Sequence, residues 1–272
     1  MKRLINRHPN KTASMALALL PFIALLIAYM VASDIRLTEN PNDKLLPGLT
    51  TIVGAIDRMA FQESVRTGTY LFWDDTQASL LRLFMGVGIS ALIGLVIGTL
   101  NGLIPYVKAN LSPFVEVLSM VPPMAILPIL FIVFGLGEVS KVVLIVFGVA
   151  PFLMRELQQR VTELPQEQII KAQTLQASTW QIILRVVLPQ LLPRLIDAVR
   201  LSLGAAWLFL IAAEAVASTE GLGYRIFLVR RYMSMDVILP YVLWITSLAF
   251  MLDFSLKKLS RLIFPWYHKE TV

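Results

Sequence analysis

The sequence predicts an all-α membrane protein whose chain crosses the bilayer six times. Hydrophobic residues make up 57% of its 272 residues and charged residues only 15%, whereas soluble domains contain about 25% charged residues. The mean hydropathy is +0.71. Six apolar segments approach the ~20 residues that a membrane-spanning helix needs. The net charge of +6 comes mainly from residues beside and between these segments, which is typical of cytoplasmic loops and argues against nucleic-acid binding.

The spans are expected in the following order. A basic tail, 1–12, precedes the first span, 13–32, which is longer than the apolar core of a signal peptide and ends without a small-x-small cleavage site. We therefore expect this helix to be retained. A segment that is acidic on balance, 33–77, leads to a core domain, 78–256. The five spans of this domain are expected at 78–100, 114–134, 141–157, 195–217 and 237–256.

Basic residues predict the orientation of the chain. They are concentrated in the N-terminal tail, in the stretch 155–194 around the loop between the fourth and fifth spans, and in the C-terminal tail, 257–272. An even number of spans places all three on one side, and the positive-inside rule makes that side the cytoplasm. We therefore expect a multi-pass protein of the bacterial inner membrane, with both termini in the cytoplasm and 33–77 in the periplasm.

The residue types argue against several kinds of site. The chain has no cysteine, and its two histidines, His8 and His268, lie near opposite ends. We expect no disulfide, no metal site and no cofactor in this chain. A membrane-embedded enzyme would need clustered histidines, cysteines or carboxylates, and the sequence contains no such cluster.

The second span carries small residues on one helical face, because they recur at every fourth position. Such a stripe lets another helix approach closely. We expect packing within one subunit, with a seam between two identical copies as the alternative. The residues are Gly86, Ser90, Gly94, Gly98 and Gly102.

The third span is interrupted by Pro122, Pro123 and Pro128. Proline removes a backbone donor, and in lipid the freed carbonyl groups must find other partners. Two interpretations stay open. The prolines either kink the helix or make it a wall of a transport path, since transporters commonly use interrupted helices.

Glu214 lies deep in the fifth span, where a charged side chain costs a few kcal/mol to insert and is therefore a candidate site. Its expected partners are Arg225, Arg230 and Arg231, which fall on the predicted outer side against the positive-inside rule. Either an ion pair fixes the turn after the fifth span, or these residues contact a solute. Glu214 would then contact a cation, and the arginines an anion.

Two further pairs of charged residues lie near the predicted cytoplasmic interface. Asp197 and Arg200 are three residues apart, and Asp253 and Lys257 are four apart, so each pair shares a helical face. Long side chains reach water easily at this depth. We expect both pairs to be structural.

The loop 158–193 is too long for a minimal connection and too polar to insert. Residues 166–187 contain no helix breaker, Pro165 suits a helix start, and Leu188-Pro189 is expected to end the stretch. We expect two short cytoplasmic helices that form a docking surface for a soluble partner, rather than a loop packed on its own bundle.

This loop resembles the motif of the permease subunits of binding-protein-dependent ABC importers, specifically the nitrate/sulfonate/taurine/bicarbonate branch. The family motif reads Glu-Ala-Ala, three residues, Gly, nine residues, Ile-x-Leu-Pro. Ala172, Leu188 and Pro189 match it at the same spacing, and Val186 is a conservative change.

Three positions depart from the motif, namely Ile170, Lys171 and Gln176. Glu167, one helical turn earlier, is the expected substitute for the missing carboxylate. Gln176 stands where the family has glycine, which implies a turn that either needs no positive φ or is strained.

Other stretches extend the resemblance over roughly residues 78–266. They are Ala125-Ile126-Leu127-Pro128-Ile129-Leu130, Phe134-Gly135-Leu136-Gly137-Glu138, Ala206-Trp207 with Glu214, Glu220-Gly221-Leu222-Gly223, and Phe264-Pro265-Trp266.

The resemblance implies a six-helix type I ABC importer transmembrane domain with cytoplasmic coupling helices. Two permease copies, expected to be identical, would form the path through the lipid. An ABC ATPase dimer, carrying the ATP and Mg, would bind the coupling helices, and a periplasmic or lipid-anchored binding protein would deliver the solute. The chain itself would not be an enzyme, and it has no Gly-x4-Gly-Lys-Ser/Thr loop for ATP.

The resemblance also assigns residues to roles. Those expected to couple to the ATPase are Glu167, Ile170, Lys171, Ala172, Leu175, Gln176, Ala177 and Ser178. Those expected in the path or its gate are Pro122, Pro123, Pro128, Glu214, Gly221, Gly223 and Arg225.

The solute stays open between two classes. The branch implies a small anion such as nitrate, a sulfonate or bicarbonate. A finer similarity, to permeases encoded near urea- or guanidine-carboxylating enzymes, implies guanidinium or urea. The alternative function is a stand-alone secondary transporter, which predicts two repeated halves with matching broken segments, whereas the sequence has one proline-rich span.

Overall fold

The computed structural model describes residues 9–41, 43–64 and 68–268, and the regular elements in these ranges are all helical. The all-α class is therefore confirmed. The predicted tails, 1–12 and 257–272, lie partly outside the described residues.

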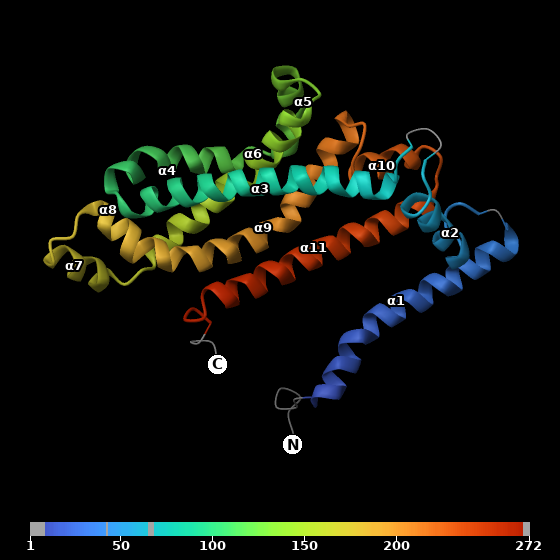
Figure 1. The fold of residues 1–272 in the computed structure, drawn as a ribbon, viewed down its shortest axis with the longest axis horizontal. Coiled ribbons are helices and arrows are strands. Elements are labelled where there is room, and N and C mark those ends of the chain that lie inside the picture. Colours follow the sequence, from blue (N-terminus) through green and yellow to red (C-terminus); the bar gives the residue numbers. More distant parts are fainter. Residues whose placement is uncertain (1–8, 42, 65–67, 269–272) are drawn as a thin grey trace.

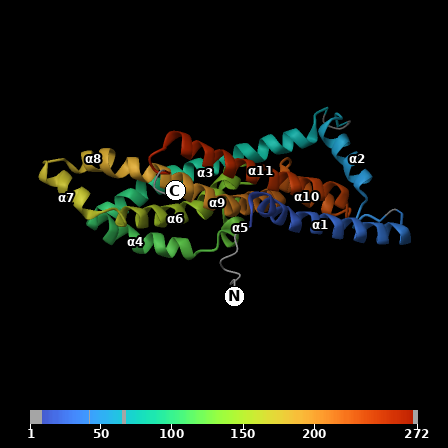
Figure 2. The same cartoon turned by 90° about the horizontal axis from the view of Figure 1, so that it is seen from below.

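Four long helices run along the length of the molecule and form its core (Figures 1 and 2). One continuous hydrophobic core joins residues from all four of them. The four helices are α3 (Leu71–Leu103), α6 (Glu138–Thr162), α9 (Leu188–Ala217) and α11 (Met235–Ile263).

The two ends of the molecule carry different short helices (Figure 1). One end, predicted to lie outside the cell, holds α2 (Leu49–Ala60) and α10 (Leu222–Arg230). The opposite end, predicted to be cytoplasmic, holds α7 (Gln166–Thr174) and α8 (Thr179–Ile182).

Four of the described helices are long and apolar enough to cross a membrane, and a bent pair would make a fifth. The four are α1 (Lys11–Glu39), α3, α11 and the continuous helix Thr179–Ala217. The bent pair is α4 (Pro105–Met120) with α5 (Pro123–Phe134). The predicted fourth span, 141–157, is helical within α6 but is not among these, so the count of six spans stays a prediction.

The small-residue stripe of α3 packs against α6 within the same chain. A Cβ atom added at Gly86, Gly94 or Gly102 would come within 2.5–2.7 Å of Ile145, Leu153 and Val161, respectively. The three glycines are eight residues apart in α3, and the three side chains that they face are eight residues apart in α6. Each of these glycines therefore lies against one branched side chain of α6. Packing within one subunit is confirmed, and a seam between copies on this face is excluded.

The third predicted span is broken at the double proline, as expected. Val121 and Pro122 both take extended backbone angles, with ψ of 122° and 117°. A residue that precedes proline is disfavoured in the α region, and here two successive residues are restricted in this way. The helices on either side meet at 96°, and α5 projects sideways from the bundle (Figure 1).

The fifth predicted span begins earlier than expected. A π-helical turn, Ile183–Val187, joins α8 directly to α9 and makes one helix of 39 residues. The prediction that Leu188-Pro189 ends the loop helix is wrong. Pro189 instead lies just after the π-helical turn and inside the continuous helix, so the proline does not end it.

Helix α1 stands apart from the core (Figure 1). Its most apolar stretch is entirely exposed in the single chain. The C-terminal part is attached to the following segment, because Tyr29 and Ser33 donate hydrogen bonds to the carbonyl groups of Pro47 and Leu46 at 2.7 and 3.0 Å.

Candidate functional site

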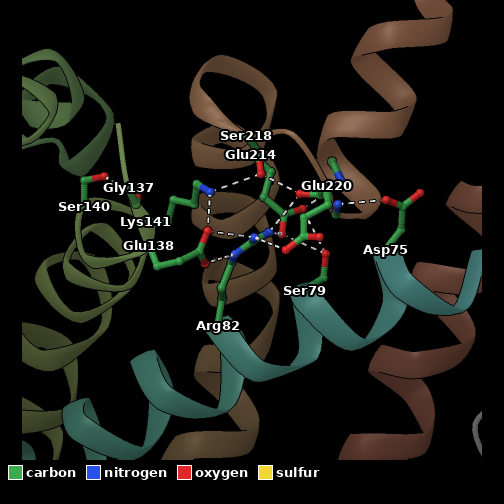
Figure 3. Close-up of polar contacts among 12 residues, drawn as sticks. Asp75, Ser79, Arg82, Gly137, Glu138, Ser140, Lys141, Glu214, Ser218 and Glu220 are labelled. Atoms are coloured by element: carbon green, nitrogen blue, oxygen red, sulfur yellow. Dashed lines mark hydrogen bonds and ion pairs between the residues drawn. The ribbon is translucent and has the colours of Figure 1, made fainter. Parts of the chain in front are cut away.

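A buried arginine, Arg82 of α3, is the centre of an ionic cluster near the end of the molecule that carries α10 (Figure 3). Its Nη1 donates to Glu214 Oε1 at 2.7 Å and to the carbonyl of Glu220 at 3.0 Å. Its Nη2 donates to Glu138 Oε1 at 2.9 Å, and Nε also donates to Glu138. Lys141 donates to Glu138 at 2.7 Å and to Ser218 at 3.1 Å.

This Arg82 cluster (Arg82, Glu138, Lys141, Glu214, Ser218 and Glu220) ties α3, α6, α9 and the turn before α10 together at one point. Its carboxylates differ in exposure. The Glu214 side chain is fully buried, whereas the Glu138 and Glu220 side chains are each 57% exposed. Glu214 therefore depends on protein partners for its charge, while the other two also have water.

The turn before α10 is held by side chains from α3 and α9. Three successive backbone N–H groups, those of Gly221, Leu222 and Gly223, donate to Asp75, Ser79 and Glu214 at 2.8–2.9 Å. The first N–H groups of a helix have no partner inside it, so these three bonds cap α10.

Gly221 has no room for a side chain. Its φ is +122°, and an added Cβ atom would lie 2.5 Å from Glu214 Oε1 and 2.8 Å from Arg82 Nη1. Glycine is therefore required both for the backbone conformation and for the close approach of the ion pair.

The ion pair predicted for Glu214 exists, but its partner was predicted wrongly. Glu214 pairs with Arg82 and not with Arg225, Arg230 or Arg231. Arg225 instead pairs with the buried Asp75 of α3 at 2.7 Å.

The remaining arginines and Tyr241 complete this region. The Tyr241 hydroxyl also donates to Asp75, at 3.0 Å. Arg230 is exposed and lies over the ring of Phe227, and Arg231 is exposed.

The proline break borders a cavity of about 410 Å³ between α4 and α6. Pro123 lines this cavity, whereas Pro122 and Pro128 are exposed. Opposite Pro123 lie α6 residues of mixed character, including Pro151, Phe152 and Arg155. The break thus faces open space, as expected for an interrupted helix.

The turn between α7 and α8 is a Schellman motif with glutamine at its left-handed position. Gln176 has φ of +58°, and the N–H of Ala177 donates to the carbonyl of Ala172 at 3.1 Å. This position strongly favours glycine. Of the two expectations for Gln176, the strained turn is confirmed and the turn without positive φ is excluded.

Ser178 begins α8 as the N-cap of a capping box. Its Oγ accepts from the N–H of Gln181, and its own N–H donates to Gln181 Oε1 at 2.8 Å. Two helix-terminal donors are satisfied in this way, so the start of the 39-residue helix is well defined.

The predicted coupling residues form an exposed surface. Ile170 and Leu175 are 54% and 76% exposed although they are apolar, and Trp180, which was not among the predicted residues, is 66% exposed. Glu167, Lys171 and Gln176 are exposed beside them, while Ala172 and Ala177 pack inward.

Glu163 fixes the base of the 158–193 loop. It pairs with Arg160 at 3.1 Å and with Arg194 of α9 at 3.3 Å, so the loop leaves and re-enters the bundle at one ion-pair network. The hydrogen bond from Arg160 lowers the pKa of Glu163 below its usual value. The carboxylate is therefore charged at neutral pH.

One predicted pair near the cytoplasmic interface is confirmed and the other is wrong. Asp197 pairs with Arg200 at 3.1 Å. Asp253 pairs with Arg200 from α9 at 2.8 Å, and not with Lys257 of its own helix. A contact between helices thus replaces the expected contact along one helix.

Sequence reasoning missed Arg82, Ser79 and Asp75, which carry most of the contacts around Glu214 and α10. The sequence did contain an indication that these residues matter. Arg82 is a charged residue inside a span, and the three residues are spaced so that they share one face of α3. No three His, Asp or Glu side chains among the described residues come together in a way that could hold a metal ion.

Comparisons with known proteins agree with this architecture. Residues 79–268 match the family described as "Binding-protein-dependent transport system inner membrane component". The taurine transport system permease protein TauC of Escherichia coli (strain K12) is 35% identical over 84% of this chain and 79% of its own length. The bicarbonate transport system permease protein CmpB of Synechococcus elongatus is 35% identical over 67% of this chain and 66% of its own length.

A third relative and a solved structure extend the comparison. The putative aliphatic sulfonates transport permease protein SsuC of Bacillus subtilis (strain 168) is 29% identical over 82% of this chain and 78% of its own length. An inward-facing structure of the MetNI methionine ABC transporter superposes with a TM-score of 0.64 at 22% identity, over 74% of this chain and 99% of that one, which shows a common fold. The match over residues 79–268 places the chain in the family of inner-membrane components of binding-protein-dependent transport systems, in the branch of the taurine, sulfonate and bicarbonate permeases.

Proposed function

We propose that this chain is the permease subunit of an ATP-driven importer for a small anion of the sulfonate or bicarbonate class. The observation that carries the proposal is the 35% identity to permeases whose names specify taurine and bicarbonate transport. Membership of this family argues against a stand-alone secondary transporter.

The structure argues against a cationic solute such as guanidinium. Glu214, the residue expected to contact a cationic solute, is fully buried and already bonded to Arg82, Ser79 and the N–H of Gly223. It has no free oxygen directed at a path. The cation hypothesis thus loses the residue on which it depended.

In this proposal α7 and α8 dock to an ABC ATPase dimer. Exposed apolar residues on a soluble surface mark interaction sites, and Ile170, Leu175 and Trp180 form such a surface at one end of the molecule. Glu167, Lys171, Gln176 and Ser178 supply polar contacts around it, and Ala172 and Ala177 hold the turn in shape.

A continuous helix would carry the motion from the ATPase to the far end of the permease. Thr179–Ala217 begins at the Ser178 cap and contains Glu214 of the Arg82 cluster near its other end. At 1.5 Å per residue this helix is about 58 Å long. ATP-driven movement of α7 and α8 would therefore shift the Arg82 cluster, and with it Gly221, Gly223 and Arg225.

Two copies of the chain and lipid complete the proposed assembly. The apolar stretch of α1 is exposed in the single chain, and α5 projects from the bundle with Ile132 84% exposed. Both apolar surfaces must be buried against lipid or protein. We assign α5, with Pro122 and Pro128 at its exposed side, to the interface with the second permease, and α1 to lipid and the second copy. An external binding protein would meet the end with α2 and α10, and both chain termini would face the cytoplasm.

Co-purification tests the ATPase contact. The complex is extracted in mild detergent with the tagged permease, and the ATPase subunit is quantified. Scrambling the exposed positions of residues 171–177, with Ala172 and Ala177 kept in place, is expected to remove most of the ATPase while the permease keeps its thermal unfolding midpoint. A matched scramble of the exposed residues 230–233, at the opposite end, is expected to leave recovery intact. Equal ATPase recovery from both variants would exclude α7 and α8 as the docking surface.

Uptake into proteoliposomes tests the transport function. The complex with its binding protein is expected to import radiolabelled taurine or bicarbonate only when ATP is present on the ATPase side. Uptake that continues without ATP, driven by an ion gradient, would contradict the proposal.

A further inference from the structure

A groove lies between α4 and α6, on the side of the proline break that faces α7. The cavity of about 410 Å³ at Pro123 forms one part of it. A second cavity of about 200 Å³ adjoins the first and shares Arg155 and Gln159 with it. The groove therefore runs from the break in the third span toward the 158–193 loop.

The lining of this groove is mixed, with mainly apolar residues at the proline break and polar residues toward the 158–193 loop. Ser119 and Gln159 line the first cavity, and Ser112 and Gln158 line the second. Gln158 accepts a hydrogen bond from Asn101 at 2.7 Å and donates one to Ser112 at 2.9 Å. Polar side chains inside spans almost always face the bundle interior or a water-filled cavity. Ser119 and Arg155 lie within the predicted spans 114–134 and 141–157 and both line the first cavity, so that cavity is expected to hold water.

Arg155 lines both cavities of the groove, and its guanidinium is bound to a hydroxyl group and not to a carboxylate. Its Nη1 donates to Ser119 Oγ at 2.9 Å, and among the described residues it forms no ion pair. The adjacent Glu156 is bound to Arg160 at 2.7 Å. Lys108 and Glu116 also line the groove, and their charges offset one another. The four charged lining residues, Lys108, Arg155, Glu116 and Glu156, carry no net charge together, but Glu156 is bound to Arg160, so Arg155 presents a guanidinium that no carboxylate among the described residues neutralises.

We propose that this groove is the part of the solute path nearest the 158–193 loop, and that Arg155 contacts the anionic solute there. The proposal rests on the proposed function for the solute class. A guanidinium presents a fork of N–H donors that matches a sulfonate or carboxylate, and Ser119 adds a hydroxyl beside it. The larger cavity lies within the usual range of small-molecule sites, about 300–1,000 Å³.

Cysteine labelling tests the groove independently of transport, because the chain has no cysteine of its own. The complex carrying Ser119→Cys is treated in membranes with an anionic reagent, sulfonatoethyl methanethiosulfonate, and with a cationic one, trimethylammonium-ethyl methanethiosulfonate. Both are expected to react. Adding Arg155→Gln is expected to lower the ratio of anionic to cationic reaction rates about fivefold or more, because one positive charge a few ångströms away is lost.

Two matched controls accompany the labelling. Arg261→Gln removes another exposed arginine that forms no ion pair among the described residues, far along α11, and is expected to leave the ratio unchanged. Leu92→Cys places a thiol on the exposed apolar face of α3 and is expected to resist both reagents. No reaction at Ser119→Cys would overturn the water-filled groove, and a ratio insensitive to Arg155→Gln would overturn the role of Arg155.

Transport kinetics supply a second readout. In proteoliposomes, Arg155→Gln is expected to raise the KM for taurine or bicarbonate at least fivefold while ATPase activity stimulated by the binding protein stays within twofold of the original. Arg155→Lys is expected to recover part of the loss, since it restores the charge but not the fork. Equal loss of ATPase activity and uptake would instead assign Arg155 a structural role. If the unmodified complex imports no anion, the proposed function fails, while the labelling ratio still decides whether the groove attracts anions.

Discussion

Arg82 of α3 and Glu214 of α9 form an ion pair at 2.7 Å in which neither side chain is more than 2% exposed. The two residues are 132 positions apart in the chain. The pair is surrounded by hydrogen-bonding partners on both sides, so each charge is compensated without water. Its removal therefore has consequences that differ from those of a surface ion pair.

Replacing Arg82 by methionine is expected to lower the free energy of unfolding by about 3–5 kcal/mol, because Glu214 is left buried and unpaired. The measurement is the thermal unfolding midpoint in detergent. The double variant Arg82→Met/Glu214→Gln removes both charges and is expected to recover part of the loss. A single variant that unfolds at the original temperature would show that the pair contributes nothing to stability.

Glu214→Gln is expected to impair uptake without preventing assembly. The amide cannot accept from Arg82, Ser79 and Gly223 at once, since one of its two terminal groups is a donor. The α9–α10 turn is then less firmly held while the bundle stays folded. Initial uptake rates and ATPase co-purification are measured side by side, with Glu39→Gln at the exposed end of α1 as the control. A normal initial uptake rate at limiting solute concentration would show that the Glu214 carboxylate is not required for transport.

The glycine stripe allows a test within one helix. Gly94→Ala is expected to destabilise the protein by about 1–3 kcal/mol, because the new Cβ atom would lie 2.6 Å from Leu153. Gly88→Ala, six residues earlier, meets nothing within 4 Å and is expected to be neutral or to stabilise by about 0.5–1 kcal/mol. Thermal unfolding of the two variants is compared directly. The same shift in both would contradict the close packing of α3 on α6.

Gln176→Gly is expected to stabilise the turn between α7 and α8 by about 1 kcal/mol, since it relieves the left-handed backbone at φ +58°. Gln176→Val is expected to have the opposite effect, because a branched side chain tolerates this conformation poorly. Hydrogen exchange over residues 166–182 measures both. The turn would be shown to be unstrained if the glycine variant exchanged as fast as the original.

The sequence predicted the elements of this fold better than their partners. Periodicity and proline positions marked the core helices, the break at Pro122 and the helical character of 166–187. These features depend on local backbone chemistry, which a single sequence contains. The predicted end at Leu188 was wrong because the helix continues through Pro189 after a π-helical turn at Ile183–Val187, and the proline in the sequence does not indicate such a turn.

The ionic contacts were harder to predict because they cross between helices. Pairs along one helix follow from spacing, as for Asp197 and Arg200. Arg82–Glu214 and Arg200–Asp253 join residues 132 and 53 positions apart, and their identity depends on which helical faces meet. The stripe of small residues on α3 indicated which face of this helix packs closely against another helix, but it did not identify the partners of the charged residues.

The double proline has a consequence for how two subunits come together. The elbow between α4 and α5 arises from the ring geometry of Pro122 and Pro123, and needs no neighbouring helix to bend it. In the proposed dimer, a newly inserted chain would therefore already hold α5 at this angle before it meets its partner. Little conformational entropy would then be lost when the second copy packs against α5, so formation of the proposed dimer would resemble the docking of two rigid bodies.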